Sequence, residues 1–214
     1  MAGQSQRVRR GSAPGLLQEA AREVFAERGY EATTREIALR AGVSHELIFR
    51  YFDSKEKLFF DAVVTPLLDG VGGLHQRWLD DPVLTARDHD RLIRRFTTGF
   101  YEFVSANQSI ARAVVHLFAS RSTEGEVERL RSQISETLAP MVETIDEYLA
   151  SAGLRRSSPA LKLRLAMLFV GVAAVFLPMT YGGDEELPED KEVIDELATM
   201  LSQGLQRNGL REPG

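Results

Sequence analysis

Side chains that can hydrogen-bond to nucleic-acid bases gather in one short stretch of this sequence, residues 44–50. His45 could donate to guanine or to a phosphate, Glu46 could accept from the N4 amino group of cytosine, and Leu47 could contact a thymine methyl. Arg50, about one helical turn further on, is long enough to reach guanine or the DNA backbone. These residue types at helical spacing predict direct readout of a DNA major groove.

Glu46 has two interpretations. A carboxylate near DNA phosphates weakens binding unless a base donor meets it, so Glu46 could select cytosine. Alternatively, Glu46 pairs with Arg50, its i+4 neighbour, and turns away from DNA. The sequence favours neither interpretation over the other.

Residues for other kinds of chemistry are sparse. The chain has no cysteine, which excludes disulfides, a thiolate nucleophile and a Cys-containing zinc site. None of its four histidines pairs with another at i,i+4, and no nucleotide-binding or serine-hydrolase motif is present. Asp88, His89 and Asp90 could chelate a metal weakly, but we interpret them as the charged start of a helix. We therefore expect no enzymatic activity, no cofactor and no metal.

Two short helices must position the base-reading side chains. Thr33 and Glu36 form the pattern of a capping box, which predicts that the first helix starts there. Ser44 is expected to cap the second helix, which runs to about Phe52. Gly42 lies between them and can adopt the positive φ that a tight turn requires.

The spacing of small and apolar residues around this turn is typical of a helix-turn-helix. Ala38 is small where the two helices would cross, and Ile48, six residues after Gly42, returns an apolar side chain to the crossing. Ile37 and Val43 complete the expected contact. The alternative is an αα-corner inside a helical bundle, which needs the same small residue and glycine.

Apolar residues at steps of three and four predict helices along the rest of the chain, and no alternating strand pattern is present. The apolar positions from Leu16 to Phe25 predict a first helix that Gly29 ends. Asp53 or Ser54 would cap a fourth helix, and we interpret the glycines at 70, 72 and 73 as a bend. Longer helices are expected around 92–104, 110–118, 127–148 with a kink at Pro140, 161–177 and 193–205. The predicted fold class is all-α.

The N-terminal segment, about residues 14–60, resembles the DNA-binding domain of TetR-type transcriptional regulators. The residues that carry the resemblance are Phe25–Tyr30, Thr34, Ile37–Ala38, Ala41–Ser44, Tyr51–Phe52 and Ser54–Glu56. The resemblance implies an all-helical homodimer with an N-terminal helix-turn-helix DNA-binding domain and a larger helical domain for ligand binding and dimerisation. It further implies a repressor that leaves a palindromic DNA operator when a small-molecule effector binds.

The resemblance also implies that four residues hold DNA phosphates: Thr34, Ser44, Tyr51 and Lys55. This chain departs from the family at Phe49, where the family often has Tyr, and at Glu46, where a small residue is common. The complete predicted DNA-binding set is Thr34, Ser44, His45, Glu46, Leu47, Phe49, Arg50, Tyr51 and Lys55.

Charge is distributed unevenly along the chain. The net charge is −5, made up of +2 over residues 1–60 and −7 over residues 61–214. Arg7, Arg9 and Arg10 stand at the N-terminus without a nearby acid, which fits an end that faces a polyanion. We expect a basic arm over 1–13, a helix-turn-helix domain over 14–60, and an effector-binding and dimerisation domain over 61–214.

An effector pocket between the helices of the larger domain would be mostly apolar, which predicts a hydrophobic ligand if one exists. Trp78 and His116 are of particular interest because each brings a polar atom that needs a partner when it is buried. The candidate lining residues are Trp78, Phe100, Tyr101, Phe103, His116, Phe118, Met167, Phe169 and Phe176.

The last two long helices are expected to form the dimer. Residues 161–177 are apolar nearly all round, and the stripe over 193–205 supplies a second helix, so two copies would give a four-helix bundle. The predicted interface residues are Leu168, Gly171, Ala174, Val175, Ile194, Leu197 and Leu201.

The longest uncharged run, Leu165–Gly183, contains Pro178 and is apolar only to about Met179. Because a bilayer span needs about 20 apolar residues, we interpret this run as a buried helix and expect no membrane partner. Residues 1–30 lack a signal-peptide core, so a cytoplasmic location is expected.

The alternative to a regulator is a helical protein-interaction module, or an enzyme without a recognisable motif.

Overall fold

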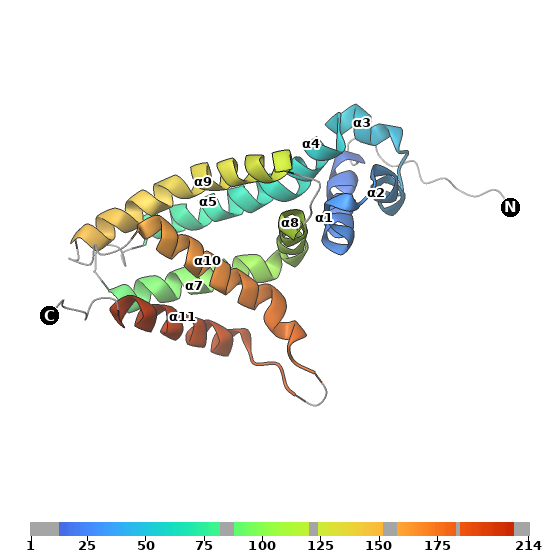
Figure 1. Ribbon diagram of the computed structural model, residues 1–214. Helices are drawn as coiled ribbons and strands as arrows, with labels where there is room; N and C mark the ends of the chain where they lie inside the picture. The colour runs from blue at the N-terminus through green and yellow to red at the C-terminus, as the bar shows by residue number, and fades with distance from the viewer. Residues whose placement is uncertain (1–12, 82–87, 120–123, 152–157, 183–184, 208–214) are drawn as a thin grey trace. The chain divides into compact units, whose positions relative to one another are not determined.

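The computed structural model describes residues 13–81, 88–119, 124–151, 158–182 and 185–207, and every regular element within them is helical (Figure 1). The all-α prediction is confirmed. The predicted basic arm, apart from Ala13, lies outside the described residues. The α-helices are α1 (Ala13–Arg28), α2 (Thr34–Ala41), α3 (Glu46–Phe52), α4 (Lys55–Phe59), α5 (Thr65–Leu79), α7 (His89–Ala106), α8 (Gln108–Ala119), α9 (Glu124–Ser151), α10 (Pro159–Phe176) and α11 (Asp190–Arg207).

Three shorter helical segments complete the described chain. A 3₁₀ turn, Gly29–Glu31, follows α1, and another, Leu177–Met179, follows α10. A π-helical segment, Phe60–Val64, joins α4 to α5, so that the chain is helical without a break from Lys55 to Leu79.

The chain divides into two compact units. The first comprises residues 1–68 and 109–132, and the second comprises residues 69–108 and 133–214. Each unit therefore combines two stretches of sequence, whereas the sequence suggested a single boundary after residue 60.

The first unit is built around α1. Leu17, Ala21 and Phe25 are fully buried along one face of this helix, as their helical spacing predicts. The Phe25 ring meets the Phe59 ring edge to face, with centroids 5.0 Å apart. Gly29 ends the helix at a φ of +67°, and a Cβ there would lie 3.0 Å from Cβ of His116, so only glycine fits between α1 and α8.

Local capping fixes the two short helices of the turn motif. Thr33 accepts from the backbone N–H of Glu36 at 3.3 Å, while the Glu36 carboxylate accepts from the backbone N–H of Thr33 at 2.7 Å. Gly42 adopts a φ of +65° between α2 and α3, as expected. Ser54, rather than Asp53, caps α4 by accepting from the backbone N–H of Lys57 at 3.0 Å.

The start of α3 differs from the prediction. Ser44 does not cap it: the helix begins at Glu46, His45 takes the position before it, and the Ser44 hydroxyl donates to the Glu46 carboxylate at 3.1 Å. A serine hydroxyl can donate as well as accept, and here the nearby carboxylate competes with the helix backbone for it.

The second unit is organised around α7, on which both α10 and α11 pack (Figure 1). The N-terminus of α7 is capped by Asp88, which accepts from the backbone N–H of Arg91 at 3.0 Å and confirms the helix start expected there. Figure 1 shows α9 running along α5, and the two are joined by a contact of 3.0 Å between His75 Nε2 and Thr144 Oγ1.

The glycine cluster at 70–73 does not form a bend, contrary to the prediction. All three glycines lie inside α5, and the ring of Phe103 on α7 occupies the place where a Gly70 Cβ would stand. Gly70 therefore permits close packing of the Phe103 ring on α5, and α5 is one continuous helix through all three glycines.

The burial predicted for α10 is only partly correct. Val170 and Ala174 are buried against other helices of the same chain, but a face that includes Leu161, Leu165 and Leu168 is exposed. By length and composition alone, the segment Pro159–Met179 could cross a membrane, and 22% of its most apolar window is buried. The described residues of the single chain thus leave an apolar face of α10 exposed.

Candidate nucleic-acid interface and ligand cavity

The orientation of α3 separates core side chains from side chains that can reach DNA. Ile48 and Phe52 are buried, which anchors the helix on α1 and α4. Glu46, Phe49 and Arg50 are exposed, and Phe49 is 47% exposed in spite of its apolar ring. Of the side chains predicted to read bases, Glu46 and Arg50 are therefore exposed, whereas His45 and Leu47 are partly buried.

Two residues predicted to contact DNA contact each other. Thr34, the first residue of α2, and His45 lie 2.8 Å apart between Oγ1 and Nε2. The His45 ring also meets Phe49 edge to face, at a centroid distance of 5.2 Å. The start of α2 and the start of α3 are joined by a polar contact at the predicted DNA-facing end.

Of the two interpretations of Glu46, the structure bears only on the pairing with Arg50, and it shows a different partner for the carboxylate. The Glu46 carboxylate accepts from the Ser44 hydroxyl, and among the described ion pairs none joins Glu46 to Arg50. The Arg50 guanidinium instead lies over the Tyr51 ring, 5.9 Å from its centroid. Glu46 and Arg50 are thus available to DNA independently of one another.

Lys55 is positioned at the start of α4 by Tyr30. Its ammonium donates to the Tyr30 carbonyl and lies over the Tyr30 ring, 4.4 Å from the centroid. Both contacts hold the ammonium itself, the group for which the family resemblance implies a phosphate contact, against Tyr30.

An ion-pair cluster holds α2 against α1. Arg40 donates to the Glu27 carboxylate at 2.8 Å and 3.1 Å and to Glu23 at 3.0 Å. The hydrogen bond from Arg40 lowers the pKa of Glu27 below its ordinary value, while the two carboxylates raise the pKa of Arg40. Because all three side chains are exposed, we attribute to them the orientation of α2 rather than a large stabilisation.

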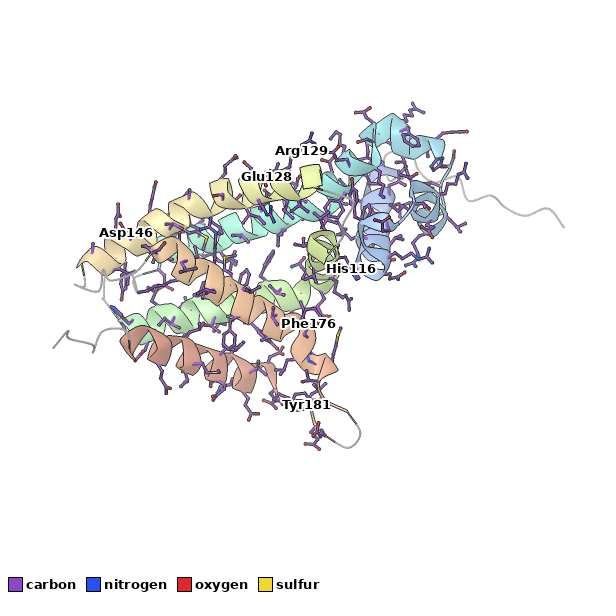
Figure 2. All side chains as sticks on the ribbon, in the orientation of Figure 1. His116, Glu128, Arg129, Asp146, Phe176 and Tyr181 are labelled. Carbon is purple, nitrogen blue, oxygen red and sulfur yellow. The ribbon has the colours of Figure 1, made fainter. Side chains whose placement is uncertain are left out.

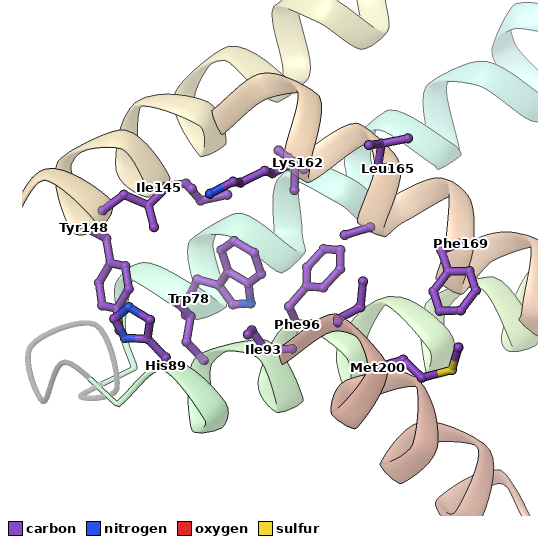
Figure 3. Close-up of a pocket in the computed structure, with 15 residues that line it drawn as sticks. Trp78, His89, Ile93, Phe96, Ile145, Tyr148, Lys162, Leu165, Phe169 and Met200 are labelled. Atoms are coloured by element: carbon purple, nitrogen blue, oxygen red, sulfur yellow. The ribbon is translucent and has the colours of Figure 1, made fainter. Parts of the chain in front are cut away.

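The second unit contains a partly open cavity of about 430 Å³ (Figure 3). This volume lies within the range of about 300–1,000 Å³ that is usual for small-molecule sites. The wall is almost wholly apolar, with His89, Tyr148 and Lys162 as its main polar members. The lining residues are Trp78, His89, Leu92, Ile93, Phe96, Ile145, Tyr148, Leu149, Lys162, Leu163, Leu165, Ala166, Phe169, Met200 and Leu201.

The structure brings only two of the predicted pocket residues to this cavity, Trp78 and Phe169. Phe100 and Tyr101 are core residues elsewhere in the unit, and the Tyr101 hydroxyl donates to Asp190 at 3.0 Å. Burial raises the pKa of Tyr101, and the hydrogen bond to Asp190 raises it further.

The remaining predicted pocket residues lie elsewhere. Phe103 packs on Gly70, and Met167 is half-buried on α10 but does not line the cavity. Phe176 is exposed at the C-terminal end of α10, and His116 belongs to the first unit, where it packs on Gly29 (Figure 2). The side chain of Phe118 lies outside the described residues. An apolar residue in a helical domain can pack against many different neighbours. Residue type alone therefore could not predict which apolar side chains line the cavity.

The sequence analysis missed three polar lining residues: His89, Tyr148 and Lys162. The acids beside His89 were correctly interpreted as a helix start, but the side chain between them faces Tyr148, with 2.6 Å between Nδ1 and the hydroxyl. The signal that could have identified them is a histidine and a tyrosine on the apolar faces of two different helices.

Four of the residues predicted for the dimer interface are already buried in the single chain. Ala174, Val175, Ile194 and Leu197 are buried within the chain itself, because the faces of α10 and α11 that carry them pack inside the second unit. Gly171 and Leu201 are partly buried, and Leu168 is 63% exposed.

These features define a class: a helix-turn-helix DNA-binding protein whose second helical unit contains an apolar cavity. The family model described as "Bacterial regulatory proteins, tetR family" matches residues 17–62. Residues 17–62 therefore carry the DNA-binding domain of the TetR family of transcriptional regulators.

Named relatives agree with this assignment. The HTH-type transcriptional activator FasR of Mycolicibacterium smegmatis is 26% identical over 200 residues, which cover 92% of this chain and 84% of the relative. The HTH-type transcriptional repressor KstR2 of Rhodococcus jostii is 33% identical over 94 residues, which cover 44% of each chain. The protein is accordingly a DNA-binding transcriptional regulator and not an enzyme.

Solved structures show the same fold over nearly the whole chain. The fatty acid degradation regulator FadR from Bacillus halodurans superposes with a TM-score of 0.62 at 20% identity, covering 92% of this chain and 99% of that one. The TetR family regulator PfmR from Thermus thermophilus gives a TM-score of 0.60 at 22% identity, with coverage of 92% and 99%.

Proposed function

We propose that this regulator is a repressor that binds an inverted-repeat DNA operator as a homodimer and leaves it when a small, mainly apolar ligand occupies the cavity of the second unit. The observation that carries the proposal is the pairing of an exposed base-reading face on α3 with a 430 Å³ apolar cavity in the same chain. In a homodimer two copies of α3 would meet two half-sites, and this is why the operator is expected to be palindromic.

Repression is proposed in preference to activation because relatives that match part of the chain, such as KstR2, are named repressors. The relative aligned over most of the chain, FasR, is named an activator, so the sign of regulation needs its own test. A reporter gene placed behind the selected operator separates the two: a repressor lowers expression and an activator raises it.

The test of DNA binding is selection of bound sequences from random duplex DNA with the purified full chain. Enrichment of an inverted repeat is expected. A bound pool with no shared sequence would overturn the proposal. The FadR structure is named a fatty acid degradation regulator, which makes acyl compounds the first ligands to test for release of the selected DNA.

A further inference from the structure

The cavity wall contains a buried polar atom that no protein group satisfies. Within the described residues, His89 Nε2 is the buried side-chain nitrogen or oxygen that lacks a hydrogen-bond partner. A buried polar group left unpaired costs free energy, so nearly all such groups in folded proteins have a partner. Since His89 also lines the cavity, a ligand that displaces the side chains covering Nε2 can supply that partner.

The other ring nitrogen fixes what Nε2 offers. His89 Nδ1 lies 2.6 Å from the Tyr148 hydroxyl, and the two rings are 5.0 Å apart. A neutral imidazole has one donor and one acceptor nitrogen, and a phenol is the stronger donor of this pair. With Tyr148 donating to Nδ1, Nε2 carries the hydrogen and presents a donor, which calls for an acceptor atom on the ligand.

Charge in the wall favours an anion. Lys162 is the single charged side chain among the fifteen lining residues that the structure describes, and no carboxylate lines the cavity. Figure 3 shows Lys162 running from α10 toward α9, the helix that carries Ile145 and Tyr148. A cation in an otherwise apolar wall interacts more strongly with an anion than it would in water.

We propose that the cavity binds an amphipathic carboxylate. Its apolar body lies among Trp78, Phe96 and Phe169, and its carboxylate accepts from His89 Nε2–H and faces the Lys162 ammonium. The inference rests on the proposed ligand-responsive function and adds the ligand's chemical class and the residues that recognise its head group.

Calorimetric titration of the full chain with decanoate and with methyl decanoate, which is neutral, tests the roles proposed for Lys162 and for His89. Decanoate is expected to bind more tightly than the ester. Lys162→Met should weaken decanoate about tenfold or more and leave the ester nearly unchanged, since a hydrogen bond or contact to a charged group is worth about a factor of ten. His89→Leu should weaken both ligands, because each has an acceptor oxygen.

Two further variants separate recognition from misfolding. His89→Gln keeps a side-chain N–H donor and should retain more of the affinity than His89→Leu. Tyr101→Phe removes a buried hydroxyl from the same unit that does not line the cavity, so it should leave both affinities unchanged. Thermal melts confirm that each variant is folded.

The inference is overturned if wild-type protein does not bind decanoate, if it binds decanoate and the ester equally, or if His89→Leu keeps full affinity. The proposed function fails separately, in the DNA experiments. Failure to select an operator argues against repression without affecting the calorimetry. Decanoate that binds through His89 without releasing DNA argues against ligand control while leaving the head-group site supported.

Discussion

The hydroxyl of Thr34 and the imidazole of His45 lie 2.8 Å apart between Oγ1 and Nε2, which ties the first turn of α2 to the residue before α3. If Nε2–H donates to Oγ1, the Thr34 hydroxyl hydrogen remains free to donate to a DNA phosphate. His45 would then act on DNA through Thr34, by orienting a phosphate contact, and its ring N–H would no longer be available to a base.

We therefore expect Thr34→Val and His45→Phe to weaken DNA binding as one unit. Each single variant breaks the same chain of hydrogen bonds, so the double variant should lose less than the sum of the two single losses. A coupling of about 0.5–3 kcal/mol is typical for residues in direct contact. The coupling is obtained by measuring the affinity of the selected operator for the wild type, the two single variants and the double variant.

Melting temperatures serve as the control for this double-mutant cycle. The capping box of α2 uses Thr33 and Glu36, so Thr34→Val leaves the cap in place and melting temperatures should change little. Additive losses in the double variant would show that Thr34 and His45 contact DNA separately.

Base preference is expected to depend on Glu46. Its carboxylate is exposed, and its hydrogen bond to Ser44 leaves acceptor capacity for the N4 amino group of cytosine. Glu46→Ala should remove one base preference in each half-site, worth about 1–3 kcal/mol of discrimination. Sequence selection with Glu46→Ala and Arg50→Ala shows which side chain reads: a preference lost only with Arg50→Ala assigns the contact to the arginine.

Lys55 should contribute to affinity without contributing to sequence preference. Each phosphate contact adds about 0.9 to the slope of log K against log salt, so Lys55→Ala should lower the slope by about two for a dimer. Lys57 on the same helix donates to Asp61 at 2.8 Å, so Lys57→Ala is a matched control that should leave the slope unchanged. Equal slopes for the wild type and Lys55→Ala would exclude a phosphate contact.

Stability should fall in mild acid because of His75. Burial lowers the pKa of His75 below its ordinary 6.5, so between the folded and unfolded pKa values the unfolded chain binds more protons. The neutral imidazole's contribution is complete above about pH 6.5 and is lost as the pH falls through the folded pKa. Melting temperatures across this interval should fall less for His75→Gln than for the wild type.

His116→Gln is the comparison for this experiment, since His116 is exposed. This variant should follow the wild-type curve. If His75→Gln and the wild type lose stability in parallel, another group controls the acid response.

Features fixed by neighbouring residues could be predicted from the sequence. The capping box of Thr33 and Glu36, the left-handed Gly42 and the Ser54 cap each depend on side chains within a few residues, and all three are present. Ser44 shows the limit of such signals. Its hydroxyl could either accept from the backbone at the start of α3 or donate to the Glu46 carboxylate, and in the structure it donates to Glu46.

The cavity could not be predicted in the same way. His89 and Tyr148 are 59 positions apart and meet only because α7 and α9 pack in the same unit. Residue type predicted which side chains are apolar, but helix rotation decided which of them line the cavity. The same rotation placed Ala174 inside the chain and Leu168 outside it.

The exposed apolar face of α10 is expected to form the dimer. Leu161, Leu165 and Leu168 recur at steps of four and three along this face, and the described part of the chain leaves them exposed. Leu168→Glu should leave each protomer folded and give a light-scattering mass near 23.9 kDa, whereas the wild type should give twice that value at micromolar concentration. Ala174→Glu should instead destabilise the protomer, because Ala174 is 1% exposed and an uncompensated buried charge costs about 3–5 kcal/mol. A dimer that survives Leu168→Glu, or a folded monomer produced by Ala174→Glu, would place the interface on the other face of the helix. The operator affinity of the Leu168→Glu monomer should fall steeply, since one copy of α3 can contact only one half-site.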